Sequence, residues 1–436
     1  MKTLTLCFCI NLSYFLSAFI QTSAITINSY NIEVALSESS QAADVKVICD
    51  ISKTDDFGSV QFLLNSKSKI HSVTYLKNDS WLEIPFSFNG KDSLLLITDE
   101  HFIESNNYKL KFEYLFPLDE MNDTLIILDR GHRWYPLIGN QIFTYMMKCE
   151  VPESYSVLSS GNLIEETDSG NSVFIYECDK PVLKMPLIVF KRGYFQNVEL
   201  LSDENKLEYY SQEPDSTTIN RILNQADSIL SYFSTKIGPY SREELIYFEV
   251  SDFGGINVGS GLLTIGSQSI EMINKGYKDM LILTIAQQWF GANVFADFSE
   301  PGFFFFTISL PHYLKLMYIK DNAGEAAFNN ALLKPLDSYK EFAGNESDIP
   351  IINVDMPNTR EKGLILYAKG PYVLNIIAQE MGIETWKLFL MDIYKTFSGK
   401  IMSLDDFENY INEYDTSGKS LALFKKLINE KGLPKE

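Results

Sequence analysis

The chain has 436 residues, of which 45% are hydrophobic, 13% aromatic and 22% charged. This composition is typical of a globular protein and excludes a disordered chain, a coiled coil and a collagen-like repeat, while the length favours two domains, because single cores stop growing near ~250–300 residues. The formal net charge of −20 repels phosphate backbones, so nucleic acid is not an expected ligand, and a charged partner should be basic.

The N-terminus has the pattern of an export signal. Lys2 supplies a short positive region, residues 4–20 form an uncharged and mostly apolar run, and Thr22, Ser23 and Ala24 offer the small residues of a cleavage site. We therefore expect residues 1–24 to be a signal peptide and the protein to be periplasmic, secreted or displayed at the cell surface. An uncleaved signal anchor is the alternative, since the apolar run is near the minimum length of a membrane span.

Residues 25–200 are predicted to form a β domain. Runs such as 32–36, 45–51 and 108–114 are short, are rich in β-branched and aromatic residues, and are separated by turn signals. Regular spacing with little helical periodicity predicts an antiparallel β-sandwich or saddle.

Three cysteines remain once the signal is removed: Cys49, Cys149 and Cys178. An odd number in an exported protein suggests one disulfide and one free thiol. Cys149 and Cys178 both lie in strand-like runs and are the preferred pair. Three buried free thiols are the alternative.

Residues 201–436 are predicted to be mainly helical, with a short strand region near 245–265. Apolar residues recur with helical spacing along one face of the first helix. They are Ile219, Ile222, Leu223, Ala226, Ile229, Leu230 and Phe233. Further helical patterns cover residues 277–294, 367–381, 383–396, 404–414 and 420–430.

Five short motifs follow one another in this second half. They are IGPY at 237–240, FGGINVGSGLLT at 253–264, AQQWFG at 286–291, YAKG at 367–370 and GLP at 432–434. Together they resemble the landmarks of the M1 family of zinc aminopeptidases, the gluzincins. These landmarks are FG-PYP, GAMENWGLIT, the end of HELAHQWFG, YxKG and a closing G-P. The resemblance implies an α+β multidomain protein, in which a β-sandwich or saddle precedes a thermolysin-like helical domain with a small sheet.

The resemblance also places the family's active-site positions. Its two zinc-binding histidines fall on Leu283 and Gln287, its general base on Thr284, its glutamate ligand on Phe306 and its amine-binding glutamate on Val258. Leucine and phenylalanine have no donor atom, a carboxamide is a poor zinc ligand, and threonine is no base near neutral pH. We therefore expect no zinc or other cofactor, and a pseudoenzyme rather than an enzyme.

No other catalytic motif replaces these positions. The four histidines, His71, His101, His132 and His312, are scattered, without an HExxH motif or a GxSxG nucleophile turn. His101 and Glu104 form a lone HxxE, which we interpret as a coincidence. Tyr367 matches the tyrosine that in the family stabilises the tetrahedral intermediate, but a structural role is preferred here.

Residues 303–306, four phenylalanines, stand where the family has WLNE. Core filling is the preferred interpretation, and the floor of a hydrophobic groove is the alternative. Pro311 should interrupt a helix in the apolar segment that follows, which would leave Tyr313 and Leu316 exposed as a candidate partner surface. We also expect Thr284, Gln287 and Gln288 to satisfy one another by hydrogen bonds.

The sequence thus predicts an exported, non-catalytic protein of the M1 aminopeptidase type. It would act as a binding or scaffold subunit of a protein assembly, with protein partners and an attachment to a membrane as one option. The sequence gives no strong signal for a small-molecule ligand. A hydrolase or peptidase with an unconventional active site is the alternative.

Overall fold

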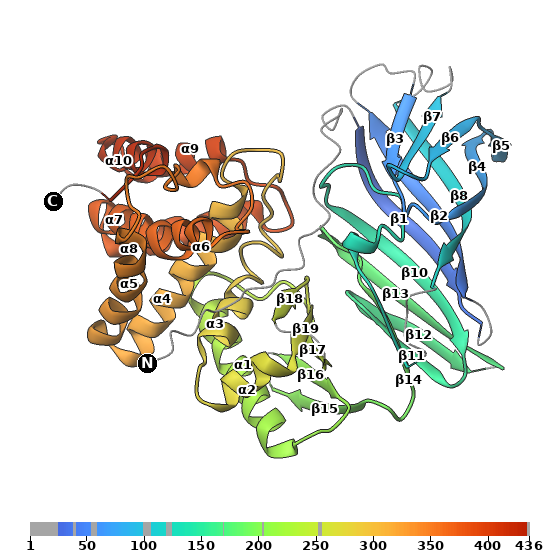
Figure 1. The fold of residues 1–436 in the computed structure, drawn as a ribbon, viewed down its shortest axis with the longest axis horizontal. Helices are drawn as coiled ribbons and strands as arrows, with labels where there is room; N and C mark the ends of the chain where they lie inside the picture. The colour runs from blue at the N-terminus through green and yellow to red at the C-terminus, as the bar shows by residue number, and fades with distance from the viewer. Residues whose placement is uncertain are drawn as a thin grey trace. The chain divides into compact units, whose positions relative to one another are not determined.

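A computed structural model describes residues 25–37, 41–53, 59–98, 106–118, 124–168, 170–202, 205–251 and 255–433. The expected signal peptide and the HxxE motif at His101 lie outside these ranges. The chain forms two compact units, coloured from blue to red along the chain in Figure 1. Of the described residues, those up to Asn197 and Tyr210–Pro214 form the β unit, and Val198–Tyr209 with those from Asp215 onward form the helical unit.

An eight-stranded sheet forms one layer of the β unit. Every neighbouring pair is antiparallel except β1 and β10, which are parallel. In spatial order the strands are β12 (Asn162–Asp168), β13 (Asn171–Val182), β10 (Phe143–Pro152), β1 (Ile25–Ala35), β2 (Ala42–Lys53), β8 (Asn107–Pro117), β4 (Lys69–Lys77) and β5 (Ser80–Glu83).

Two smaller sheets complete this unit. One has the order β11 (Tyr155–Ser159), β14 (Leu187–Lys191) and β9 (Leu125–Leu128), and the other has the order β3 (Ser59–Leu63), β7 (Leu94–Thr98) and β6 (Phe86–Asn89). Side chains alternate between the two faces of each strand, so the apolar positions of the large sheet and the small sheets enclose a common core. The predicted β-sandwich is confirmed.

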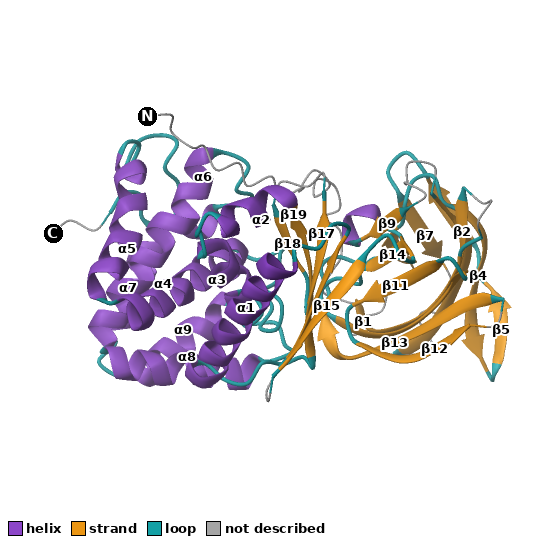
Figure 2. Cartoon of the chain, turned by 90° about the horizontal axis from the view of Figure 1, so that it is seen from below, coloured by secondary structure: helices purple, strands orange, loops and turns teal. Residues whose placement is uncertain are grey.

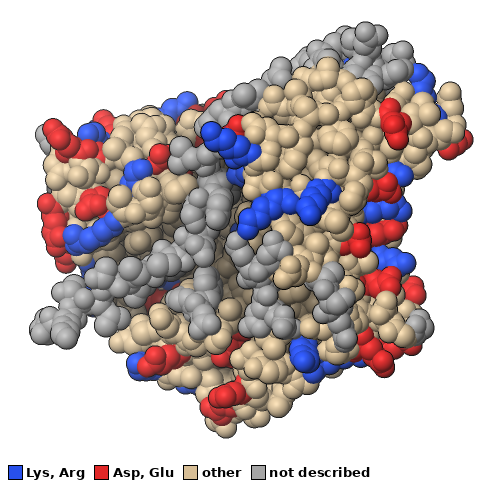
Figure 3. Space-filling view, turned by 45° about the vertical axis from the view of Figure 1, so that its right-hand side comes forward, with Lys and Arg blue, Asp and Glu red and all other residues tan. Residues whose placement is uncertain are grey.

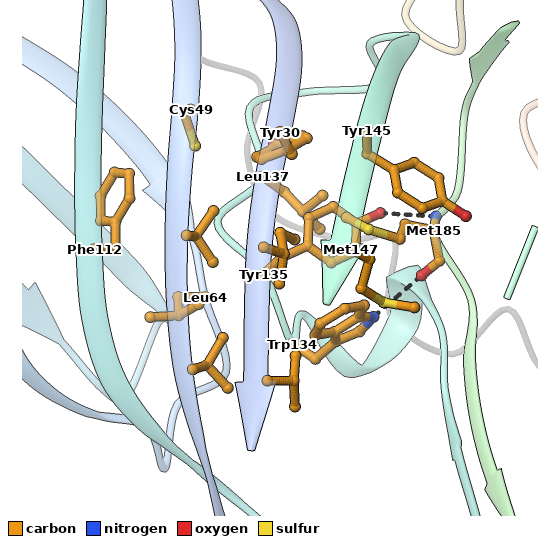
Figure 4. Packing of buried hydrophobic residues seen from close by; sticks show 14 of the residues in the cluster. Tyr30, Cys49, Leu64, Phe112, Trp134, Tyr135, Leu137, Tyr145, Met147 and Met185 are labelled. Carbon is orange, nitrogen blue, oxygen red and sulfur yellow. Dashed lines mark hydrogen bonds between the residues drawn. The ribbon is translucent and has the colours of Figure 1, made fainter. Parts of the chain in front are cut away.

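The polar atoms of the buried aromatic residues find partners within this core (Figure 4). The Trp134 indole donates to the Met185 carbonyl at 3.2 Å, and the Met185 amide donates to the Tyr135 hydroxyl oxygen at 3.3 Å. The Tyr30 hydroxyl donates to the Pro136 carbonyl at 2.5 Å. Because buried polar groups are costly without partners, these bonds fix the orientation of the large rings.

The preferred disulfide is wrong. In the pairing of β10 with β13, Cys149 lies opposite Phe174 and Cys178 lies opposite Tyr145. The two cysteines are therefore offset by four residues, or about 13 Å along the strands, which exceeds the reach of a disulfide. Cys49, Cys149 and Cys178 are buried free thiols, as the alternative prediction held.

The helical unit begins with a five-stranded sheet. Its order is β15 (Gln196–Leu201), β16 (Lys206–Ser211), β17 (Glu244–Val250), β19 (Leu262–Gly266) and β18 (Ile256–Val258). Figure 2 shows that strands dominate the β unit and helices most of the other. The α-helices are α1 (Ser216–Lys236), α2 (Ser267–Asn274), α3 (Asp279–Ala286), α4 (Leu310–Ala323), α5 (Glu325–Lys340), α6 (Arg360–Leu364), α7 (Gly370–Met381), α8 (Ile383–Phe397), α9 (Leu404–Tyr414) and α10 (Lys419–Asn429).

The first helix, α1, matches its sequence pattern. All seven predicted apolar residues are buried, and Asp215 caps the N-terminus by accepting from the Thr217 amide at 3.1 Å. An aspartate at this position satisfies an amide that the helix leaves without a partner. Among the described residues, no helix is both long enough and apolar enough to cross a membrane.

A buried carboxylate and a buried ammonium hold the end of the chain to the helical unit. Asp348, with no exposed surface, accepts hydrogen bonds from the Tyr339 hydroxyl at 2.8 Å and from the Gly432 amide at 2.5 Å. Lys369, 1% exposed, donates to the Glu430 carbonyl at 2.6 Å. We call these five residues the C-terminal clasp.

Candidate functional site

The end of α3 carries three of the predicted positions. Leu283 and Thr284 are buried, and the Thr284 hydroxyl donates to the Leu281 carbonyl of its own helix at 3.1 Å. Gln287, just past the helix, is partly exposed, and its side-chain amide donates to the Thr307 carbonyl at 3.2 Å. These side chains therefore bond to the backbone and not, as expected, to one another.

Gln288 ties the same helix end to the loop after β18. Its amide nitrogen donates to the Gly259 carbonyl and its oxygen accepts from the Gly261 amide, both at 3.0 Å. Val258, the amine-binding position of the resemblance, is partly exposed at the end of β18, which is the edge strand of its sheet.

The phenylalanine run enters a π-helical turn, η3 (Phe305–Ser309), that leads into α4. Phe304, Phe305 and Phe306 are buried. The ring centroid of Phe407 lies 6.2 Å from that of Phe305 and 5.4 Å from that of Phe306. Three of the four phenylalanines therefore fill the core, as the preferred interpretation held, while Phe303 is partly exposed.

The predicted partner surface needs correction. Tyr313 and Leu316 are each only 3% exposed. Tyr313 packs edge-on against Trp386 at 5.8 Å, and Leu316 belongs to a cluster with Phe328 and Leu332. The reason is that Pro311 lies in the first turn of α4, where a proline is tolerated and does not break the helix.

Tyr367 lies in a second π-helical turn, η5 (Ile365–Lys369). Its side chain is partly exposed and its ring stacks on that of His312, with centroids 5.5 Å apart. Burial raises the pKa of Tyr367, and burial together with Lys315 lowers that of His312 well below its usual range. Any side chain at Gly363 would collide with the Tyr367 hydroxyl.

The two π-helical turns pack directly against each other. The Ser309 hydroxyl donates to the Leu366 carbonyl at 2.6 Å, and a side chain at Gly370 would collide with Ser309. Each turn is followed two residues later by a proline, Pro311 or Pro371. A proline cannot donate to the carbonyl four residues earlier, which is Thr307 for Pro311, and this carbonyl instead receives the Gln287 amide.

The structure thus joins the segments in which the sequence placed the site residues. Residues 259–261, the end of α3, η3 and η5 are linked by the hydrogen bonds of Gln287, Gln288 and Ser309. We call this arrangement the four-segment site. Sequence reasoning missed its π-helical turns, although such turns are frequent at functional sites. The paired prolines were the available signal.

The residues at the family's zinc positions do not fit a zinc ion. Leu283 and Phe306 have no donor atom, the Thr284 hydroxyl and the Gln287 amide nitrogen are bonded to carbonyl groups, and a carboxamide oxygen is a poor zinc ligand. Across the part of the chain that the structure describes, no group of three or more His, Cys, Asp or Glu side chains is placed to hold a metal ion.

Comparison with known proteins identifies the fold. No protein-family model and no curated protein matches the sequence. Among solved structures, a mutant M1 zinc metallopeptidase from Deinococcus radiodurans, bound to a Tyr-Ser-Ala substrate, superposes with a TM-score of 0.75 at 14% identity, covering 95% of this chain and 96% of that one. A two-domain M1 zinc metallopeptidase mutant bound to L-tryptophan gives 0.74 at 15% identity, with the same coverage of 95% and 96%. The Deinococcus radiodurans M1 zinc metallopeptidase itself gives 0.73 at 15% identity, covering 94% and 95%.

Two expectations are overturned by these structures. The sequence predicted that the chain is not an enzyme and needs no zinc, but the three solved structures above are of zinc metallopeptidases, two of them with a substrate or an amino acid bound. Substitution at one set of positions is no ground for denying activity or zinc, because catalysis and metal binding can use other side chains. The comparisons establish the architecture: this chain has the fold of the M1 zinc metallopeptidases.

Proposed function

We propose that the chain is an exported binding protein with the M1 metallopeptidase fold, which acts as a subunit of a protein assembly. The proposal concerns binding and leaves open whether the chain also catalyses a reaction. Its partner would be a protein rather than a nucleic acid, because the net charge is −20.

The four-segment site carries this proposal. The large apolar residues at the family's ligand positions are buried, whereas Val258, Gln287 and Tyr367 are partly exposed. The hydrogen bonds of Gln287, Gln288 and Ser309 hold the surrounding backbone in place. A surface whose shape is fixed before contact loses little conformational entropy on binding. These features suit recognition of a peptide or of a protein segment.

Surface charge and the N-terminal pattern support an exported partner. On the face shown in Figure 3, acidic and basic side chains lie side by side toward the edges, around a broad area with few charged side chains. Such mixed surfaces favour specific protein contacts over general adhesion to a charged polymer. Residues 1–24 have the composition of a signal peptide, so the assembly would lie outside the cytoplasm, either free or at a membrane.

Affinity purification of the full chain from its native source tests the proposal. We expect a protein to co-purify in a constant ratio and to co-elute in size-exclusion chromatography. Replacing the partly exposed Tyr367 and Gln287 by alanine should weaken that association, while alanine at the exposed Asp337 should not. A chain that elutes alone from every extract, and binds no peptide from a random library, would contradict the proposal.

A hydrolase or peptidase activity is the second candidate. It is favoured by the likeness to metallopeptidases, one of them solved with a peptide substrate, and by Tyr367, which matches the family's tyrosine and is partly exposed. Purified protein should be assayed with aminoacyl-arylamides and short peptides, with and without added zinc. Turnover that is lost in Tyr367→Phe would support this candidate, and turnover that is unaffected would assign the activity to another site or to a contaminant.

A further inference from the structure

A hollow lies on the outward face of the large sheet in the β unit. Its volume is about 270 Å³, close to the lower end of the range for ligand pockets. Strands β1, β2, β4, β8 and β10 all contribute to it. We call it the sheet hollow, and its polar and small lining residues are Glu33, Ala35, Asp44, Lys46, His71, Glu113, Lys148 and Glu150.

The register of the sheet explains the hollow. Ala35 on β1 lies directly opposite Asp44 on β2 and Glu150 on β10. A methyl group thus stands between two longer side chains on flanking strands, each about 5 Å away. The result is an apolar floor with a carboxylate on either side.

The charges that line the hollow do not cancel. Four carboxylates line the hollow with two ammonium groups, Lys46 and Lys148, and a third ammonium group, that of Lys111, pairs with Glu113 at its edge, which leaves an excess of one negative charge. Glu33 is paired with Lys46 at 3.1 Å. Glu113 accepts from the Ser72 hydroxyl at 2.7 Å and pairs with Lys111 at 3.5 Å, and both interactions lower the pKa of Glu113.

Of the four carboxylates that line the hollow, Asp44 and Glu150 form no ion pair with any described residue. Glu150 accepts a hydrogen bond from the neutral Asn171 amide at 2.8 Å. Lys148, two residues before Glu150 on β10, shares this face, so the single excess negative charge lies with Asp44 and Glu150 beside Ala35. A carboxylate pair of this kind is complementary to an ammonium or a guanidinium group, which forms short charge-assisted hydrogen bonds.

Two apolar side chains lie near the charged ones on the outward face of the large sheet. Met146, two residues before Lys148 on β10, is 40% exposed, and Ile48, two residues after Lys46 on β2, is partly exposed. Side chains two apart in a strand share a face. The surface beside the hollow can therefore contact the backbone and apolar atoms of a polypeptide as well as its charge.

We propose that the sheet hollow seats a lysine or arginine side chain from a basic segment of the partner protein, with its charge between Asp44 and Glu150. The inference rests on the proposed binding function and names the chemistry of the partner. The long-range field of a chain with net charge −20 would steer a basic segment toward it.

A labelled decapeptide of alternating arginine and serine is a suitable probe, and the same peptide with citrulline in place of arginine is its neutral match. Fluorescence anisotropy should show the arginine peptide binding the full chain at least about tenfold more tightly than the citrulline peptide. The double variant Asp44→Asn/Glu150→Gln should remove most of that difference. Ala35→Phe, which fills the hollow without removing charge, should weaken binding by a similar factor.

A charge-matched control separates the hollow from the general field. Asp337→Asn/Glu384→Gln removes the same charge from exposed positions of the helical unit and should change peptide affinity less than about twofold. Equal losses in both double variants would overturn the inference, as would a partner that co-purifies equally well with wild type and with Asp44→Asn/Glu150→Gln. Failure of the proposed function has a different signature, since no partner would be captured by either chain. Thermal midpoints within a few degrees of wild type would confirm that the variants fold.

Discussion

The helical unit buries two places of opposite chemistry. At the four-segment site the interior is apolar. Phe306, at the position that the resemblance assigns to a zinc-binding glutamate, and Phe305 are buried, and their rings pack against Phe407. At the C-terminal clasp, by contrast, a carboxylate and an ammonium, Asp348 and Lys369, are almost completely buried.

The difference lies in the partners that each place provides. The clasp offers donors and acceptors from two separate segments: the Tyr339 hydroxyl of α5, and the Glu430 carbonyl and Gly432 amide that follow α10. A buried charge is tolerable only with such partners. At the four-segment site, the polar side chains of Thr284, Gln287, Gln288 and Ser309 are hydrogen-bonded to the backbone. A buried charge there would have no partner, so buried phenylalanines cost less free energy than charged residues. Polarity in this unit follows the available partners rather than the depth of burial.

The largest expected effect comes from the clasp. Asp348→Ala would leave the Tyr339 hydroxyl and two backbone amides, those of Gly344 and Gly432, without their acceptor. We expect a loss of about 3–5 kcal/mol in the free energy of unfolding, measured by urea denaturation at constant m-value. Asp337→Ala, at an exposed ion pair with Lys340, should cost less than about 1 kcal/mol. If Asp348→Ala and Asp337→Ala lowered the free energy of unfolding by similar amounts, the clasp would stabilise the unit no more than an exposed ion pair does.

Truncation in the aromatic filling should come next. Phe306→Ala should lower the free energy of unfolding by about 3–4 kcal/mol, because it opens a cavity beside Phe407. Phe303→Ala, at a partly exposed position in the same run, should cost clearly less. A well-tolerated Phe306→Ala would show that the filling is loose and that the site interior can accept a ligand.

The buried hydroxyl of Tyr394 is neutral but ionisable, so it is intermediate between the apolar filling and the buried charges. Its contribution to stability should depend on pH. Burial raises the pKa of Tyr394 from 10.0 to about 12, and its hydroxyl donates to the Pro239 carbonyl at 2.6 Å. Because the folded-state pKa lies above the unfolded value, the stabilisation is complete below pH 10 and is lost as the pH rises toward 12. The loss should reach about 2–3 kcal/mol. Tyr394→Phe should flatten this alkaline decline, and an unchanged decline would assign it to other groups.

The smallest effect should come from the bonds that link the four-segment site. Gln288→Ala removes two hydrogen bonds to residues 259–261 and should cost about 1–2 kcal/mol. Gln287→Ala, partly exposed with one bond to Thr307, should cost less than about 1 kcal/mol. The reverse order would mean that Gln287, rather than Gln288, holds the segments together.

Local patterns predicted much of this molecule. Short runs rich in β-branched and aromatic residues, separated by turn signals, predicted the β-sandwich, and the seven apolar positions predicted for α1 are all buried. The AQQWFG and YAKG motifs lie in segments that η3 links, since Gln287 of the first motif donates to the Thr307 carbonyl and Ser309 donates to the carbonyl of Leu366, which directly precedes the second motif. The strands and the helix depend on residues close together in the sequence, so the spacing of apolar residues predicts them directly.

Features that depend on distant contacts were not predictable in the same way. Tyr313 is buried because Trp386, more than seventy residues away, covers it, and the cysteines are offset because of the register between β10 and β13. The expectation of no zinc and no enzymatic activity failed for another reason. It inferred the properties of the whole protein from four positions.

The parallel pairing of β1 with β10 sets the order in which the β unit can be completed. Ser29 pairs with Thr144 and Ala35 with Glu150, so β1 cannot gain its second neighbour until more than a hundred further residues have emerged from the ribosome. Until then, one edge of a strand destined for the middle of an eight-stranded sheet stays open to pairing with other chains. Closure of so long a loop is slow. Assembly of this unit, and with it the sheet hollow, is therefore expected to be the step most dependent on chaperones.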